Sequence, residues 1–372
     1  MAVGIFALPS SFTVPAHGLE GSGTPMAIGG ARSEVHAVPL TPGRTTVFRA
    51  AASRQFRMLG VTWDDPSAPL TGSVEVRTRV SGGAPWSDWT RLDGGDGHGD
   101  DMARRGGTDP LWVDEASDAE VRIVAAGEEL SGLPDGLRLD LIDPGPRTTV
   151  RPVPAVPPVL PGAVGVESAP RPAIVSRAGW GADESISPEP PLYVPSGKIK
   201  AAVVHHTANS NGYTCADAPA VVRAIYAYHV KQLGWRDVGY NFLVDKCGTL
   251  YEGRKGGVDR AVQGAHAYGF NTQTTGIAVL GTYTTTAPPQ KVLNSVAALA
   301  AWKLGQYGID PAGTTTLTAG AAGTNYFGKS WPLGAQLTLR TIHGHRDGYN
   351  TQCPGDELYN RLPVIRAIAA SL

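Results

Sequence analysis

Apolar and polar residues alternate with a period of two in several segments between residues 31 and 143. In one segment the non-charged positions of the alternation are Val74, Val76, Thr78 and Val80. A second segment repeats the pattern at Leu137, Leu139 and Leu141. This period is typical of half-buried strands, and the Gly- and Asp-rich stretches between such segments indicate turns. The pattern predicts a β-rich accessory domain of β-sandwich or jelly-roll type over residues 31–143.

Residues 144–172 mark the end of this predicted domain. They contain nine prolines and few charges, a composition that favours a semi-rigid polyproline II spacer.

At the N-terminus of the chain, residues 1–30 hold an apolar stretch followed by small residues, which resembles the end of a secretory signal without its positive n-region. We interpret residues 1–30 as a signal remnant or a disordered N-terminus.

Residues 173–372 show a different, mixed pattern. Short apolar runs at residues 199–204 and 276–281 predict buried strands. Residues 217–233 and 289–307 predict helices, the first of them capped by Asp217. A stretch rich in Gly, Thr and Ala predicts a loop insertion over residues 312–334. The fold class we expect is therefore α/β, with a mixed central β-sheet flanked by helices in the C-terminal half.

Length, charge and hydropathy exclude several classes of protein. A chain of 372 residues is long enough for two apolar cores. The 32 Lys and Arg nearly balance the 33 Asp and Glu, and no basic run occurs, so a nucleic-acid partner is not expected. No run of eighteen apolar residues occurs, which predicts no transmembrane segment. The sequence gives no indication of the oligomeric state.

Histidines cluster in the C-terminal half, where six of the nine lie between residues 205 and 345. His205 and His206 follow one predicted buried strand, and His343 and His345 lie at the end of another. Cys353 comes eight residues after the last of them. Two imidazoles and one thiolate suit a catalytic zinc ion whose fourth position is left for water. Spacing alone does not choose among the four histidines, because neighbours on a strand point to opposite faces, and histidines at strand ends often only satisfy hydrogen bonds.

Several motifs in this half resemble the zinc amidases that include the peptidoglycan recognition proteins and the phage amidase-type lysozymes. The resemblance covers roughly residues 174–370 and keeps the order of its motifs. They are Ser176-Arg177-Ala178-Gly179-Trp180-Gly181, His205-His206-Thr207-Ala208, Gly234-Trp235-Arg236-Asp237-Val238-Gly239-Tyr240-Asn241-Phe242, Tyr251-Glu252-Gly253-Arg254, Gly264-Ala265-His266-Ala267 with Asn271, and His345-Arg346 followed by Cys353-Pro354-Gly355.

The resemblance implies a ligand set and a catalytic pair. Its zinc ligands fall on His205, His345 and Cys353. Tyr240 matches the tyrosine that stabilises the developing oxyanion. Thr351 stands where phage enzymes have a lysine and recognition-protein amidases a threonine, so it offers a hydroxyl and no charge. No secure general base follows; Glu252 is a candidate by residue type only.

The resemblance also implies contacts with a muramyl peptide. The positions that match such contacts are His206, Thr207, His229, Arg254, His266 and Asn271. Arg254 would pair with a stem-peptide carboxylate. Many family members have Gly-Trp directly after this arginine, whereas this chain has Lys255-Gly256-Gly257. This difference leaves the stem-peptide preference open.

The chain has three cysteines, and if Cys353 is a zinc ligand, Cys215 and Cys247 are left without a role. We expect a disulfide between them, since it would clamp the loop beside the metal and fits an exported protein; two free thiols are the alternative.

The sequence thus predicts a secreted, cell-wall-associated enzyme. Its predicted activity is N-acetylmuramoyl-L-alanine amidase, with bacterial peptidoglycan as substrate and Zn²⁺ as cofactor. The main alternative is a recognition module that binds peptidoglycan without cleaving it. A structural wall-anchoring protein is a second alternative. Cys353 favours the enzyme, because recognition proteins that only bind typically lack this cysteine.

Overall fold

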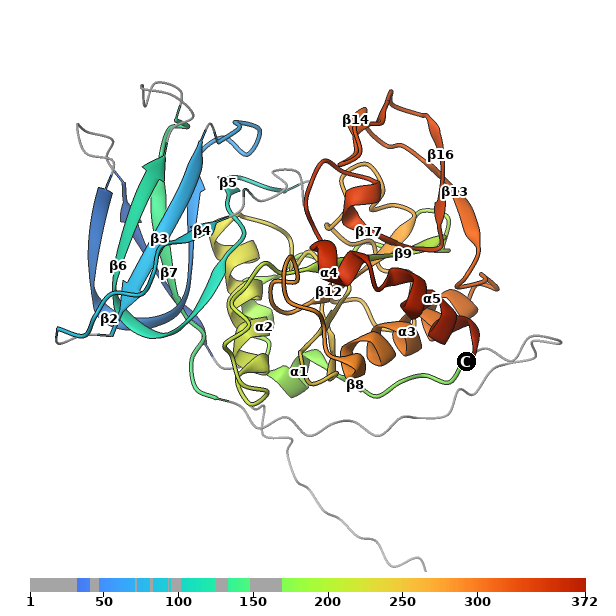
Figure 1. Ribbon diagram of the computed structural model, residues 1–372, viewed down its shortest axis with the longest axis horizontal. Helices are drawn as coiled ribbons and strands as arrows, with labels where there is room; N and C mark the ends of the chain where they lie inside the picture. Colours follow the sequence, from blue (N-terminus) through green and yellow to red (C-terminus); the bar gives the residue numbers. More distant parts are fainter. Residues whose placement is uncertain are drawn as a thin grey trace, which may run out of the picture.

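The computed structural model describes residues 32–40, 47–70, 72–80, 83–92, 94, 102–124, 133–147 and 169–372. These residues form two parts, each built around its own β-sheet (Figure 1). The predicted N-terminal segment over residues 1–30 and most of the predicted Pro-rich linker lie outside the described residues.

The N-terminal part is one antiparallel sheet in the strand order β1-β7-β2-β6-β3-β4, with β5 paired to β2. Its strands are β1 (Glu34–Pro39), β2 (Val47–Trp63), β3 (Ser73–Arg79), β4 (Thr90–Leu92), β5 (Gly106–Gly107), β6 (Leu111–Val124) and β7 (Arg138–Asp143). Val74 and Val76 of β3 are buried with Leu139 and Leu141 of β7 in its core. The predicted β-rich domain is confirmed. Of its alternating positions, Val74, Val76 and the three leucines of the second segment fill the core, whereas Val80 is 51% exposed.

The C-terminal part has a mixed six-stranded sheet in the order β17-β9-β12-β10-β11-β8. All neighbouring pairs are parallel except β10 with β11. The strands are β8 (Ile174–Val175), β9 (Ala201–His206), β10 (Phe242–Val244), β11 (Leu250–Glu252), β12 (Thr274–Val279) and β17 (Ile342–Gly344). The predicted mixed sheet flanked by helices is confirmed.

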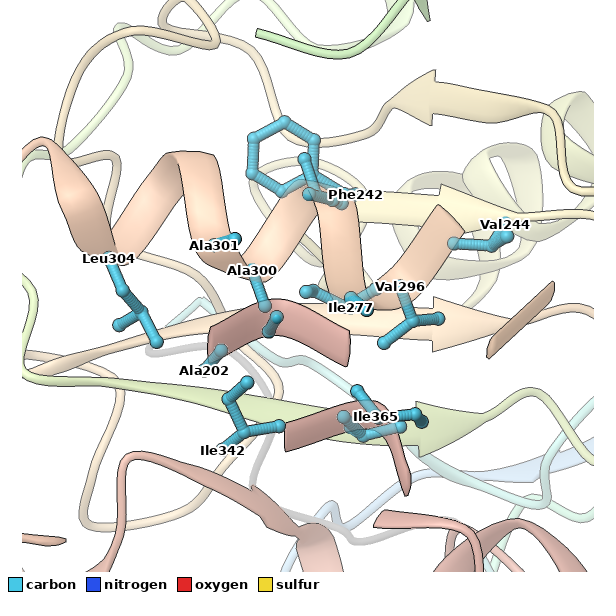
Figure 2. Close-up of a cluster of buried hydrophobic side chains, with 14 of the residues drawn as sticks. Ala202, Phe242, Val244, Ile277, Val296, Ala300, Ala301, Leu304, Ile342 and Ile365 are labelled. Carbon is cyan, nitrogen blue, oxygen red and sulfur yellow. The ribbon is translucent and has the colours of Figure 1, made fainter. Parts of the chain in front are cut away.

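Helices cover both faces of this sheet. They are α1 (Arg177–Trp180), η1 (Glu184–Ile186), α2 (Ala218–Ala227), the π-helical turn η2 (Tyr228–Gln232), α3 (Gln290–Gly305), η3 (His345–Asp347), α4 (Asp356–Tyr359) and α5 (Leu362–Ala370). Figure 2 shows α3 and α5 packed on the face that Phe242 and Val244 present. The intervening Leu243 is buried with α2 on the other face. This alternation follows from the period of two within a strand.

Two details differ from the expectations. Asp217 precedes α2, but its carboxylate makes no capping bond to the helix; it accepts hydrogen bonds from Thr214 and from Arg57 of the N-terminal sheet. The predicted loop insertion over residues 312–334 contains strands: β13 (Thr314–Thr318) pairs with β16 (Gln336–Arg340), and β14 (Gly323–Thr324) pairs with β15 (Ser330–Trp331). The threonine-rich run suits a strand, and Leu317 and Trp331 bury against Phe270.

The two parts pack directly against each other along α2 and η2 (Figure 1). Met58, Trp112 and Ile142 of the N-terminal sheet belong to the same buried cluster as Tyr228. The Tyr228 hydroxyl donates to the Thr108 carbonyl over 2.8 Å. Arg138 donates to the Gln232 side chain and Lys231 to the Ser33 carbonyl. A proline-rich spacer alone would not predict this contact, which places the N-terminal sheet beside the loops at the end of β9.

Candidate metal centre

Three segments bring nitrogen and sulfur atoms together at one edge of the C-terminal sheet. β9 ends at His206, and the parallel β17 is followed at once by η3, which starts at His345. The third segment is the loop before α4, which carries Cys353. One ligand atom from each of His205, His345 and Cys353 lies within 4.8 Å of the others. The structure therefore groups the three residues that the resemblance implied, and it does so because parallel strands end at the same edge.

The backbone around the thiol holds its sulfur in place. The Cys353 Sγ lies 3.7 Å from the Nδ1 of His205, and the His206 amide donates to the same sulfur over 3.4 Å. The Cys353 amide donates to the Thr351 hydroxyl over 3.2 Å. A hydrogen bond from an amide N–H stabilises a thiolate more than a thiol, and the thiolate is the form of cysteine that binds a metal.

Burial keeps both histidines of this group neutral. It lowers the pKa of His345 to about 3. Burial, and next the nearby His345, also holds the pKa of His205 well below its usual value. A neutral imidazole has a free lone pair on one nitrogen, as a metal ligand requires. Two neutral imidazoles and one thiolate within 4.8 Å fit a zinc ion with an open fourth position.

His266 contacts His205 through one ring nitrogen of each side chain. The Nε2 of His205 is 3.1 Å from the Nδ1 of His266. With both rings neutral, an Nε2–H donated to His266 leaves the Nδ1 of His205 unprotonated, and Nδ1 is the nitrogen nearest the Cys353 sulfur. A Cβ at Gly264 or Gly276 would come within 2.4–2.5 Å of the His266 ring. The His266 ring can therefore occupy its position beside His205 only because residues 264 and 276 are glycines.

Aromatic rings form the other side of the centre. The Tyr240 ring is 5.3 Å from the His205 ring, centroid to centroid, and half-buried. His229 lies 5.9 Å from Tyr240 and stacks on Trp235 at 4.3 Å. The Gly239 amide donates to the His229 Nδ1, which orients this second ring. Tyr240 and His229, both expected at the site, do lie beside it.

Other residues expected at the site have partners inside the protein. The Thr207 hydroxyl accepts from the Asn209 side chain and from the Gly281 amide. The Nδ1 of His206 accepts from the Tyr283 amide. Asn271 accepts from the amides of His266 and Ala267. Arg254 is only 7% exposed. The contacts of these residues with substrate stay predictions, whereas the hydrogen bonds that Thr207, His206 and Asn271 make within the protein are seen in the structure.

Two features escaped the sequence analysis. The contact between His266 and His205 joins residues 61 positions apart, and the only signal for it was the pair of glycines around His266. Tyr349 stacks on His345 with ring centroids 5.6 Å apart, and no motif pointed to it. Glu252, the candidate base, accepts instead from the Arg177 amide at the start of α1.

Cys215 and Cys247 form a disulfide in the structure, with Cα atoms 6.1 Å apart. It ties the loop after β9 to the turn between β10 and β11. Among the described residues, none of the helices is both long and apolar enough to span a membrane.

Two family models match different parts of the chain. Residues 195–356 match the family described as N-acetylmuramoyl-L-alanine amidase. Residues 23–152 match the family described as Rv3811 N-terminal galactose-binding domain-like. The first match contains the whole candidate metal centre, and the second covers the N-terminal sheet.

Curated relatives match the C-terminal half. Peptidoglycan-recognition protein SC2 of Drosophila simulans is 30% identical over 191 residues, which are 51% of this chain and 84% of that protein. Peptidoglycan recognition protein 1 of Bos indicus is 33% identical over 187 residues, 50% of this chain and 80% of that protein. The solved structure of wild-type Drosophila PGRP-LB is 26% identical, covers 51% of this chain and 91% of that one, and has a TM-score of 0.38. Through its C-terminal half, the chain belongs to the family of peptidoglycan recognition proteins and N-acetylmuramoyl-L-alanine amidases.

Proposed function

We propose that the C-terminal half hydrolyses the amide bond between N-acetylmuramic acid and L-alanine in bacterial peptidoglycan. The observation that carries this proposal is the convergence of His205, His345 and Cys353, whose ligand atoms lie within 4.8 Å of one another. A zinc ion bound there would supply Lewis-acid activation of the amide carbonyl and of a water molecule.

The protein's own groups would orient the substrate and stabilise charge. Tyr240 lies over His205, where its hydroxyl would donate to the carbonyl oxygen as that oxygen gains charge. The Thr351 oxygen accepts from the Cys353 amide, so its hydroxyl proton stays available as a second donor. His266 would hold His205 in the tautomer that leaves Nδ1 for the metal.

The muramyl peptide would extend from the metal centre along residues near Tyr240. We propose that His229 contacts it, because its ring lies 5.9 Å from the Tyr240 ring. The Arg254 amide donates a backbone hydrogen bond to the Tyr240 carbonyl, so the two residues are neighbours. We propose that the Arg254 guanidinium pairs with a stem-peptide carboxylate. We propose the same contact role for His206, Thr207, His266 and Asn271, whose internal hydrogen bonds hold their side chains in fixed positions.

A recognition module that binds without cleavage is the rival proposal. It needs the same peptide-contacting residues but no sulfur ligand. Cys353 favours hydrolysis, since the His206 amide donates to its sulfur and that sulfur lies beside His205. The disulfide between Cys215 and Cys247 supports export of the protein, and association with the cell wall would follow from the proposed substrate.

Mass spectrometry of digested, purified peptidoglycan tests the proposal. The zinc-loaded protein should release stem peptides with a free L-alanine amino group and leave intact glycan strands. Bound peptidoglycan with no released peptide would support the recognition module instead.

Replacing His266 by phenylalanine should weaken zinc binding about 10–100-fold, the usual effect of losing the hydrogen-bond partner of a ligand histidine. Phenylalanine keeps a flat ring between Gly264 and Gly276 and removes only the polar contact. Competition with a chromophoric chelator measures the affinity.

His343→Phe is the matched control, because this buried histidine contacts the Arg340 carbonyl instead of a ligand. It should change zinc affinity less than the His266 variant does. Equal zinc affinity in wild type and His266→Phe would rule out the positioning role.

A further inference from the structure

A cavity of about 750 Å³ lies between the N-terminal sheet and the loop that follows β9. On one side its lining includes Arg77, Arg79 and Trp86, and on the other Asn209, Ser210 and Asn211. This size is typical of sites that bind small molecules, and such sites often lie between domains. Neither part of the chain forms it alone.

The N-terminal wall is a ladder of alternating arginine and tryptophan side chains. The Arg79 and Arg77 guanidinium carbons lie 4.6 and 5.1 Å from the Trp86 ring centroid, and Arg77 lies 4.6 Å from that of Trp89. Arg77 also pairs with Glu120, and Arg79 with Asp118. Each guanidinium is thus held by a ring and by a carboxylate, so the wall is ordered and its charges are matched.

The opposite wall is also held in place. The Asn211 side chain donates to the Thr282 carbonyl and accepts from the Thr282 amide. The Thr282 hydroxyl donates to the Asn209 carbonyl. Ala208, with φ of 52°, turns the chain from the strand that carries His205 into this wall. The metal centre and the cavity are therefore adjacent along one short, braced segment.

The chemistry of the lining points to a neutral, hydroxyl-rich ligand. An anion or cation would find the Arg77 and Arg79 charges already matched, and the remaining charged lining residues, Arg91 and Glu115, are one of each sign. The Trp86 ring is already stacked by Arg77 and Arg79, and what it adds to the amide and hydroxyl groups of the lining is apolar ring edge. A lining that mixes apolar and uncharged polar groups suits a sugar ring, which has apolar C–H groups and polar hydroxyls. The Oδ1 of buried Asn209 and the Nε1 of buried Trp112, both on lining residues, have no hydrogen-bond partner among the described residues.

We propose that this cavity is a second binding subsite, which takes amino-sugar units of the glycan strand whose muramyl amide reaches the metal centre. The assignment to the substrate's own glycan rests on the proposed amidase function. The N-terminal sheet then acts in substrate binding, because it completes a saccharide subsite next to the loop that leaves β9.

Binding of N-acetylglucosamine tetraose to the full chain tests the proposal by calorimetry. This probe has no stem peptide and no lactyl amide, so its binding does not depend on amidase activity. Wild type should bind it, and Trp86→Ala should weaken binding about tenfold or more. Trp89→Ala is the matched control, because Trp89 belongs to the same ladder but not to the cavity lining; it should change affinity less than twofold.

Ser210→Trp fills the cavity from the opposite wall and should also remove binding while leaving the ladder intact. The thermal unfolding midpoint of each variant reports whether it is folded. No tetraose binding by wild type, equal losses in the Trp86 and Trp89 variants, or unchanged binding in Ser210→Trp would each overturn the proposal. Failure of the amidase proposal would appear in the peptide-release assay and leave tetraose binding unchanged.

Discussion

Replacing Cys353 by serine should lower release of stem peptides from peptidoglycan on the order of a thousandfold or more, to the limit of detection. The serine hydroxyl is nearly isosteric with the thiol, but it stays protonated at neutral pH and is a poor ligand for zinc. The Cys353 Sγ lies 3.7 Å from His205 Nδ1 and accepts from the His206 amide. The substitution should therefore remove a ligand and leave the surrounding backbone in place.

Zinc content and product release are measured on the same sample of this variant. Zinc per chain should fall well below one, while the affinity for a muramyl peptide should change less than tenfold, because the proposed contacts at His229 and Arg254 remain. His343→Phe serves again as the control for substitution of a buried residue in this region. Full peptide release by Cys353→Ser would show that the ligand assignment is wrong.

Tyr240→Phe should lower kcat about 10²–10³-fold and leave KM nearly unchanged, the effect expected when one oxyanion donor is lost. The Tyr240 ring lies 5.3 Å from the His205 ring, and its hydroxyl would act on the oxygen that gains charge at the transition state. Phenylalanine keeps the ring contact with His205 and His229. Zinc content should stay at the wild-type level, because the phenol is not a ligand.

Steady-state kinetics on a soluble muramyl peptide separate the possible roles of Tyr240. A raised KM with kcat preserved would make it a substrate-binding residue, and loss of zinc would make it a support of the metal centre. Tyr349→Phe is a matched control, since its ring also stacks beside the centre but its hydroxyl has no assigned role. We expect this control to keep kcat within about threefold of wild type.

The sequence predicted those features that depend on local pattern. The alternation around Val74 and Val76 predicted β3, and the apolar run at residues 199–204 predicted β9. The ligand set followed from a family resemblance, since the spacing of four histidines left several choices open. In the structure, His205 near the end of β9 and His345 just after the parallel β17 lie at one edge of the sheet, and His206 and His343 make hydrogen bonds elsewhere.

What the sequence could not predict depends on contacts between distant segments. His266 was expected to contact substrate, and only the fold places its Nδ1 3.1 Å from His205. The contact of Tyr228 with Thr108 spans 120 positions and joins the two parts of the chain. A proline-rich segment between them suggested separation, whereas packing around Trp112 and Met58 brings them together. The cavity beside Trp86 exists only because of that packing.

Zinc titration of the metal-free protein, with peptide release measured at each step, tests the central claim most directly. The rate at which stem peptides with a free N-terminal L-alanine are released should rise in proportion to added zinc and level off at one zinc per chain. The same titration of Cys353→Ser should stay flat. Peptide release by the metal-free protein, or no release at one zinc per chain, would contradict the account.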